Sequence, residues 1–473
     1  MERNKLYNKS WYEANNGALS PLPEKVLQFG TGVLLRGLPD YFINKANKKG
    51  VFQGSIVVVK STKVGGISDF EQQDNLYHHL IKGVVSGKDV YELHENTSIS
   101  RVLVATSQWR EILQVAESPE LKIVISNTTE AGLVFDPNDI QISNTPSSFP
   151  GKLLAILWHR WNHFTPNSND GGLIILPTEL FPDNGNILKK IIIDLAELQQ
   201  LPKAFMQWLQ QANDFCNTLV DRIVTGNLPQ NEQTQLETQL GYKDHLLITS
   251  EPFALWAIET SKQSTLDELS FSQVDASVVV STSIAKFREL KLRLLNGTHT
   301  FCCALAILAG FETVKAAMAN KEFNKFIFQL LDDEIAPCVL SSDISISDTQ
   351  HFIKVVLDRF SNPNIEHQWK SIAMNYTEKI KMRNLFLIEK YINLTDTVPI
   401  RMSICIAAFF VYQEKIDQPI PINEFSYNIK FENSVNDFIR LINQNGVMWT
   451  INEFINKKLL NHESISFKGE STR

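Results

Sequence analysis

Cysteines are few, long apolar runs are missing and basic residues are not in excess, and each of these features excludes a class of protein. Only five cysteines occur in 473 residues, and no two form a CxxC pair, which argues against a disulfide framework and against a cysteine-ligated zinc site. The longest apolar runs, such as ICIAAFFVY, are about half as long as a membrane-spanning helix requires. The N-terminal sequence is polar and lacks the apolar core of a secretory signal.

Acidic residues outnumber basic ones by 52 to 45, so the formal net charge is −7. A mildly acidic protein has no global attraction to nucleic acid or to anionic membranes. A local basic pocket for a small anion is compatible with this balance. The charge balance therefore predicts neither nucleic acid nor a membrane as partner, and the sparse, odd-numbered cysteines predict a cytoplasmic protein.

The first half of the chain alternates short β-rich runs with amphipathic helical stretches. Alternation of this kind predicts parallel strands joined by helices, which build a doubly wound α/β sheet. We place this Rossmann-type domain at residues 20–284, and the β-like run at 277–283 closes it. The other expected buried strands are VLQF (26–29), SIVVV (55–59), LKIVIS (121–126) and GGLIIL (171–176).

From about residue 285 the pattern becomes helical, which predicts a second, mostly α-helical domain over 285–473. The segment KFRELKLRLLNGTHTFCCALAILAG (286–310) has the pattern of one long helix, for which Gly310 is a suitable C-terminal stop. A chain of this length is too long for one ordinary hydrophobic core, which also favours more than one domain.

Gly30, Thr31 and Gly32 follow the first predicted strand, directly after Phe29. Two glycines one residue apart, between a strand and a helix, permit a tight turn and a close approach of the backbone to a phosphate, which the helix N-terminus then stabilises. The third glycine of the dinucleotide fingerprint is replaced by Leu35, and a structural turn explains many such matches. The position at the first strand-to-helix junction nevertheless favours a cofactor site here.

The second strand ends in Lys60, Ser61 and Thr62, without the acid that usually binds the ribose hydroxyls of NAD. Lys60 is compatible with the 2′-phosphate of NADP, and equally with a solvated strand end. These residues leave the choice between NAD and NADP open.

Polar residues also follow two later strands. Asn127 and Thr128 belong to SNTTEAG, which comes directly after LKIVI. Such groups contact ligands at the carboxyl edge of an open α/β sheet, although Asn, Thr and Gly are also routine turn residues. Asn184, in the Asp-Asn-Gly that follows GGLIILPTEL, fits a simple turn, but its amide could also join an oxyanion site.

Lys291, Asn296 and His299 have the spacing K-x4-N-x2-H within the predicted long helix. At about 100° per residue, Asn296 lies about 140° and His299 about 80° from Lys291, so all three share one side. An amine, an amide and an imidazole beside an apolar helix face can polarise a carbonyl, and a buried lysine can donate or accept a proton. A surface lysine, a helix Asn-Gly and a core histidine explain the same pattern without any chemistry.

Taken together, these motifs resemble the long-chain mannitol dehydrogenase family of polyol oxidoreductases, over nearly the whole chain. The resemblance implies a Rossmann domain and a helical C-terminal domain with the active site between them, NAD as cofactor, and hydride transfer without a metal. SNTTEAG and NTLVDRIVTG are more similar to the uronate branch than to the mannitol branch, which implies reduction of a hexuronate ketone such as that of tagaturonate. The segments that carry the resemblance are VLQFGTGVLLRG, SNTTEAG, FCNTLVDRIVTG (215–226), K-x4-NGTHT and FSNPNIEHQWKSIAMN (360–375).

The resemblance also implies roles for individual residues. Lys291 is implied as the catalytic acid/base. Asn296 and Asn184 are implied as the amides that hold the developing alkoxide, and His299 as a ligand of a substrate hydroxyl. Asp221, in the VDRI match, is implied near the nicotinamide.

A uronate substrate also needs a cationic partner for its carboxylate. Lys379 and Arg383, in EKIKMRN, fall in a matching region and are candidates for this contact. A solvated helix face explains both residues on pattern alone.

Two kinds of alternative remain open. The first is another activity of the same family, namely fructuronate reductase, mannitol dehydrogenase or mannitol-phosphate dehydrogenase. The second is a non-catalytic nucleotide-binding or regulatory protein on the same fold. The complete set of Lys291, Asn296 and His299 argues against this second alternative.

Overall fold

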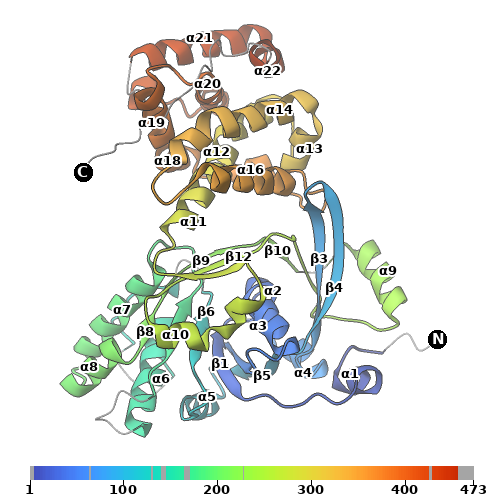
Figure 1. Ribbon diagram of the computed structural model, residues 1–473, viewed down its shortest axis with the longest axis vertical. Helices are drawn as coiled ribbons and strands as arrows, with labels where there is room; N and C mark the ends of the chain where they lie inside the picture. The colour runs from blue at the N-terminus through green and yellow to red at the C-terminus, as the bar shows by residue number, and fades with distance from the viewer. Residues whose placement is uncertain are drawn as a thin grey trace. The chain divides into compact units, whose positions relative to one another are not determined.

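The chain divides into two compact units in the computed structural model (Figure 1). The first unit comprises Met1–Gly83 and Asp89–Phe287, and the second comprises Val84–Lys88 and Arg288–Arg473. The structure describes residues 5–62, 65–128, 132–139, 145–164, 171–226, 228–425 and 429–455.

A six-stranded, wholly parallel sheet forms the centre of the first unit, with the strand order β5-β2-β1-β6-β7-β8. The chain passes from β1 through β2 to β5 on one side of the sheet, and then returns to add β6, β7 and β8 on the other side of β1. The strand order therefore reverses between the neighbouring strands β1 and β6. This is the doubly wound topology of a dinucleotide-binding fold, which confirms the fold class predicted from the sequence. The strands are β1 (Glu24–Phe29), β2 (Ser55–Lys60), β5 (Ile99–Val104), β6 (Ile123–Ser126), β7 (Ile174–Pro177) and β8 (Asp214–Phe215).

Helices cover both faces of this sheet, which is why its strands are apolar along their whole length. Every residue of β2 is buried. Leu27 lies beside Val57 and Val124 and packs with them under the helices of one face, whereas its neighbour Val26 belongs to the core of the other face. The first core contains residues of α5 (Trp109–Ala116), α6 (Phe149–His163), α7 (Asn184–Leu198) and α8 (Lys203–Gln211), and the second contains residues of α2 (Val33–Gly37) and α3 (Pro39–Lys48).

Two further sheets complete the first unit, and the sequence did not indicate either of them. A four-stranded sheet has the order β10-β11-β3-β4, and a three-stranded sheet has the order β13-β12-β9. The run at 277–283 therefore forms β13 in a separate sheet and does not extend the parallel one. The bounds are β3 (Tyr77–Val85), β4 (Lys88–Asn96), β9 (Asn217–Asp221), β10 (Val224–Thr225), β11 (Ile248–Ser250), β12 (Leu255–Glu259) and β13 (Val278–Ser281). The other helices of this unit are α1 (Lys9–Asn16), which precedes β1, and α4 (Ser68–Gln72), α9 (Gln230–Leu240) and α10 (Gln263–Glu268), which lie between strands.

The predicted long helix at 286–310 is present as a continuous helical run with a change of hydrogen-bonding in its middle. It begins as α11 (Ala285–Glu289), becomes a π-helix over Leu290–Gly297 and ends as α12 (Thr298–Leu308). Gly310 has φ of +87°, and the amide of Phe311 donates to the carbonyl of Ala306 at 2.9 Å. Gly310 therefore ends the helix as predicted, in a Schellman motif.

The described part of the second unit is helical from Arg288 onward. Its centre is α12 and α20 (Ile400–Lys415), which contact each other and are buried on nearly every side. No helix in the described ranges is long and apolar enough to cross a membrane. The remaining helices are α13 (Val314–Ala319), α14 (Lys321–Gln329), a second π-helix (Leu330–Ile335), α15 (Ala336–Val339), α16 (Ile346–Phe360), α17 (Trp369–Ile372), α18 (Tyr376–Arg383), α19 (Leu385–Thr395), α21 (Ile429–Asn445) and α22 (Val447–Ile455).

Candidate active site

Of the two glycines after β1, only Gly30 occupies a position whose backbone and packing require a glycine. Gly30 has φ of +131°, and a Cβ built there would lie 2.8 Å from Leu35 Cδ1, so this position needs a glycine. Gly32 has φ of −66° and precedes α2 as its N-cap. A Cβ at Gly32 would meet no atom within 4 Å. The absence of a side chain at Gly32 therefore leaves open space at the start of a helix, which is where a phosphate binds in dinucleotide folds.

Gly37, at the end of α2, packs closely against the four-stranded sheet. A Cβ at Gly37 would lie 2.7 Å from Val224 Cγ1 and 3.4 Å from Ile248 Cδ1. Leu35, at the usual position of the third glycine of the fingerprint, is instead a buried core residue.

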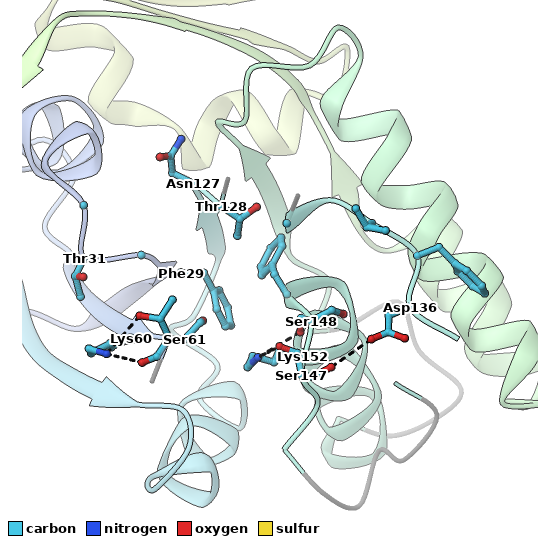
Figure 2. Close-up of a pocket in the computed structure, with 17 residues that line it drawn as sticks. Phe29, Thr31, Lys60, Ser61, Asn127, Thr128, Asp136, Ser147, Ser148 and Lys152 are labelled. Atoms are coloured by element: carbon cyan, nitrogen blue, oxygen red, sulfur yellow. Dashed lines mark hydrogen bonds between the residues drawn. The ribbon is translucent and has the colours of Figure 1, made fainter. Parts of the chain in front are cut away.

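A cavity of about 770 Å³ opens at the carboxyl ends of β1, β2 and β6 (Figure 2). It lies where the strand order reverses, which is the ligand-binding position of doubly wound sheets. The six residues predicted from the loops after β1 and β6 all line it, and Thr129 to Ala131 of the same motif lie outside the described residues. The lining residues are Phe29, Gly30, Thr31, Gly32, Lys60, Ser61, Thr62, Asn127, Thr128, Gly132, Val134, Phe135, Asp136, Ser147, Ser148, Phe149 and Lys152.

Lys60 lines this cavity, and its ammonium is engaged by the loop that follows β2. Lys60 Nζ donates to the carbonyl of Thr62 and lies 3.4 Å from Thr62 Oγ1. Figure 2 shows the lysine folded along its own loop. Lys60 is buried, so the interpretation of this residue as a solvated strand end is wrong, and its ammonium already has protein acceptors.

Glu179, which the sequence analysis did not select, fixes the loop after β6. Its buried carboxylate accepts hydrogen bonds from Thr128 N at 2.8 Å, from Thr128 Oγ1 at 2.9 Å and from Ser126 Oγ at 3.1 Å. Burial raises the pKa of Glu179 in spite of these donors. The sequence feature that could have indicated Glu179 is its position two residues after the buried strand β7, at the same edge of the sheet as Thr128.

Asn184 is fully buried at the start of α7, and its amide is held by backbone groups. Asn184 Nδ2 lies 3.0 Å from the carbonyls of both Pro177 and Glu179, while Oδ1 accepts from Gly185 N at 2.9 Å and from Thr218 N at 2.8 Å. These bonds join the ends of β7 and β9 to α7. Asn184 therefore stabilises the edge of the sheet. Its contact with the alkoxide stays a prediction.

Asp221 ends β9 as a buried residue and is not among the residues that line the cavity. The next residue, Arg222, donates to the carbonyl of Gly37 at 2.8 Å and to the carbonyl of Glu251 at 3.1 Å. Arg222 therefore ties the segment after β9 to the helix that follows the glycine loop. The predicted place of Asp221 near the nicotinamide stays a prediction.

In the second unit, the π-helix changes the geometry expected for Lys291, Asn296 and His299. A π-helix bonds residue i to residue i+5, so residues five apart lie one turn from each other. Lys291 and Asn296 both lie within this π-helix and are five apart. They are therefore more closely aligned than the ordinary helical angle of the sequence analysis suggested, because that angle assumed an α-helix. Single π-helical turns inside helices are frequently found at functional sites.

His299 lies in the first turn of α12 among aromatic and basic side chains. Its ring stacks on Phe360, with centroids 4.1 Å apart, and meets the ring of His367 edge-on at 4.9 Å. Burial, together with His367 and nearby Arg and Lys side chains, lowers the pKa of His299 well below its usual range. The imidazole is therefore neutral at neutral pH, with one donor and one acceptor nitrogen for a polar ligand.

Arg383 and Lys379 lie on α18, close to the turn that carries His299. Arg383 Nη1 donates to Thr300 Oγ1 at 3.2 Å, and Lys379 Nζ donates to the carbonyl of Ile372 at 2.9 Å. Both side chains are partly buried, and burial lowers the pKa of each. The structure therefore does not place them on a solvated helix face.

Comparison with known proteins identifies the family. The mannitol dehydrogenase Rossmann domain matches residues 24–269, and the mannitol dehydrogenase C-terminal domain matches residues 283–432. An altronate oxidoreductase of Halalkalibacterium halodurans is 38% identical over 404 residues, which are 85% of this chain and 77% of that protein. An altronate oxidoreductase of Bacillus subtilis is 36% identical over 390 residues, which are 82% of this chain and 80% of that protein.

Solved structures show the same fold. A substrate-free D-sorbitol dehydrogenase superposes with a TM-score of 0.76 at 19% identity, over 91% of this chain and 95% of that one. Pseudomonas fluorescens mannitol 2-dehydrogenase, in a ternary complex with NAD and D-mannitol, superposes with a TM-score of 0.67 at 20% identity, over 97% of this chain and 98% of that one. The resemblance drawn from the sequence motifs is confirmed, and this chain belongs to the mannitol dehydrogenase family of oxidoreductases.

Proposed function

We propose that this protein is an NAD-dependent altronate oxidoreductase (tagaturonate reductase), which interconverts D-tagaturonate and D-altronate. The observation that carries the proposal is the Lys291, Asn296 and His299 set, placed where a π-helix passes into α12. The substrate follows from the curated relatives, which are named altronate oxidoreductase and are 35% to 38% identical over most of this chain.

The residues of the cavity fit a dinucleotide. The open space at Gly32, the N-cap of α2, suits a pyrophosphate, and the loop of Asn127 and Thr128 lines the same cavity. NADH, when bound, supplies a hydride to the ketone carbon of the substrate. Two serines at the start of α6, Ser147 and Ser148, add hydroxyl groups to the lining.

The chemistry proposed for the second unit is general acid catalysis with electrostatic stabilisation. Negative charge grows on the carbonyl oxygen as hydride arrives, and Lys291 as an ammonium neutralises this charge and donates a proton. Asn296 donates its amide to the same oxygen. The neutral imidazole of His299 orients a substrate hydroxyl.

The proposal includes a reaction without a metal and a cytoplasmic location. The location is supported by the cysteines, all five of which are free thiols buried in the structure, a state typical of a reducing compartment. In the described ranges, no group of three or more His, Cys, Asp or Glu side chains is arranged to hold a metal ion. Activity that survives prolonged treatment with a chelator is the expected result for a metal-independent enzyme.

The deciding experiment follows NADH consumption with D-tagaturonate, D-fructuronate and D-fructose side by side. We expect kcat/KM for D-tagaturonate to exceed that for D-fructuronate by at least about tenfold, a difference of about 1.4 kcal/mol in transition-state binding. Preference for D-fructuronate or D-fructose would assign another activity of the family. No turnover of any ketose with a folded, NADH-binding protein would contradict the enzymatic proposal.

A further inference from the structure

Five basic side chains of the second unit gather around the start of α12. The ring centroids of His299 and His367 are 4.9 Å apart. Arg359, Lys379 and Arg383 are all near enough to His299 to lower the pKa of its imidazole. These residues come from α12, α16, α18 and the loop before α17. We call these five residues the basic cluster.

Arg383 is anchored to the same turn that carries the proposed catalytic residues. Its Nη1 donates to Thr300 Oγ1 at 3.2 Å, and Thr300 Oγ1 donates to the carbonyl of Asn296 at 2.8 Å. Arg383 Nε is buried and has no hydrogen-bond partner within the part of the chain that the structure describes. The guanidinium is therefore fixed in position while one of its donors is still available.

The walls around His299 are apolar, which strengthens the electrostatic effect of the basic cluster. Phe360 stacks on the imidazole with an angle of 17° between the rings, and Trp369 lies edge-on with a centroid distance of 6.1 Å. His299 Nε2 is buried without a hydrogen-bond partner in the described ranges. Charges act over longer distances in such surroundings than in water, because the effective dielectric constant is lower.

The acidic residues closest in sequence to the basic cluster have partners of their own. These partners are Lys315 for Glu366, Lys381 at 3.8 Å for Glu378, and the backbone amide of Ser86 at 2.7 Å for Asp358. Burial and the neighbouring Arg383 lower the pKa of Lys379, and burial with Arg359 and Lys379 lowers the pKa of His367. Arg359, Lys379 and Arg383 therefore bring three positive charges close to two imidazoles of lowered pKa, and a bound anion would relieve the repulsion between these charges.

We propose that the basic cluster binds the carboxylate of the sugar-acid substrate, and that Arg359 and Arg383 distinguish a uronate from a neutral ketose. A guanidinium matches a carboxylate with two parallel hydrogen bonds, which gives direction as well as charge. The inference rests on the proposed function, since it assigns the carboxylate of that substrate to particular residues. It adds Arg359 and His367, neither of which the sequence analysis selected as a site residue.

The test compares D-tagaturonate with D-tagatose, the ketose in which a hydroxymethyl group replaces the carboxylate. In the Arg383→Gln variant, kcat/KM for D-tagaturonate should fall by about 30-fold or more, mainly through KM, because a desolvated charge pair is lost. The value for D-tagatose should change by less than about threefold. Arg359→Gln should show the same selectivity, and Arg383→Lys should recover part of the loss because the charge returns without the fork geometry.

Two controls isolate the carboxylate contact. Arg440→Gln removes an exposed arginine of α21 that pairs with Asp437. This variant should leave kcat/KM unchanged for both D-tagaturonate and D-tagatose. The dissociation constant of NADH should be the same in every variant. Equal losses on D-tagaturonate and D-tagatose would mean that Arg383 acts only through Thr300 and the turn, and would overturn the inference.

A binding measurement separates this inference from the proposed function. Calorimetric titration of the NADH-saturated wild type should detect D-gluconate, an unreactive sugar acid, more strongly than D-mannitol, and Arg383→Gln should remove the difference. If the wild type reduces no uronate but still shows this selective binding, the proposed function fails and the carboxylate site stands. If inorganic phosphate competes better than D-gluconate, the basic cluster serves a phosphorylated ligand and the carboxylate assignment is wrong.

Discussion

The backbone amide of Thr128 donates a 2.8 Å hydrogen bond to the buried carboxylate of Glu179, which fastens the loop after β6 to the residues after β7. Thr128 Oγ1 and Ser126 Oγ donate to the same carboxylate. One buried acid thus determines where Asn127 and Thr128 lie along the cofactor cavity.

Replacing Glu179 should therefore weaken cofactor binding without direct loss of a cofactor contact. Glu179→Ala leaves the amide of Thr128 without its acceptor, a defect worth about 1–3 kcal/mol for a buried group. We expect the NADH dissociation constant, measured by fluorescence, to rise at least about fivefold. Glu179→Gln keeps an acceptor oxygen for Thr128 and should remain within about twofold of wild type. Equal effects of both substitutions would show that the charge of Glu179 matters and not its geometry.

Gly32→Val tests the glycine loop directly. A Cβ at Gly32 meets no protein atom within 4 Å, and its φ of −66° suits any residue, so the variant should fold. The branched side chain would occupy the space assigned to the pyrophosphate and should weaken NADH binding by at least about tenfold, or about 1.4 kcal/mol. Gly32→Ala should have a smaller effect. Unchanged NADH affinity in a folded Gly32→Val variant, checked by circular dichroism, would remove this loop from the site.

NADH should be preferred over NADPH, although no acid ends β2. The ammonium of Lys60 is held by Thr62 within its own loop, and turning it toward a 2′-phosphate would break that contact. Values of kcat/KM for both cofactors decide the matter. Lys60→Met should leave the NADH value within about threefold of wild type. A clear NADPH preference that Lys60→Met abolishes would identify Lys60 as a phosphate ligand.

Asp40, on α3, should make the first unit less stable as pH rises. Burial raises the pKa of Asp40 to about 7, although Gln28 donates a hydrogen bond to it at 3.3 Å. The folded state therefore retains a proton that the unfolded chain releases near pH 4, and this contribution is complete at low pH and lost as pH rises through about 7. The loss between pH 6 and pH 8 is about 1.4 kcal/mol.

Asp40→Asn isolates this contribution because the amide has a similar shape and does not titrate. The urea midpoint of the wild type should fall from pH 6 to pH 8, and that of the variant should fall less. A variant with the same pH dependence as the wild type would assign the effect to other groups.

The parallel sheet was predictable from the sequence because its strands are short, apolar on both faces and followed by turn residues. The hairpin of β3 and β4 was not, since β3 (YHHLIKGVV) buries His78, His79 and Lys82. Those polar side chains are satisfied by distant residues, such as Asp244, which accepts from His78 N at 2.7 Å. Tertiary contacts of this kind leave no local pattern.

The candidate site was predictable in part for the same reason. Residues at strand ends are placed by the sheet, so Gly30, Gly32 and Thr128 gather at one cavity. The π-helix has no comparable local signal, and the angles computed for an α-helix misplaced Asn296 relative to Lys291. Glu179 was missed because its function is to hold a backbone amide that the sequence does not display.

Lys291 should be the proton donor in reduction, since the developing alkoxide requires a titratable group and Lys291 shares the π-helix with Asn296. Lys291→Ala should keep the fold and NADH binding, because the residue is proposed to act on the reacting oxygen. Turnover should fall by about 10²–10⁴-fold for lost acid catalysis, and further because the ammonium charge is lost.

The variant's pH–rate profile separates acid catalysis from a structural role. The limb that reports the titration of Lys291 should vanish in Lys291→Ala, whereas Lys321→Ala, which removes an exposed lysine of α14, should leave the profile unchanged. His299→Ala should behave differently and raise KM as well as lower kcat, because the imidazole is proposed to bind a hydroxyl. A Lys291→Ala enzyme within a few-fold of wild-type activity would end the proposed mechanism and return Lys291 to the role of an ordinary helix lysine.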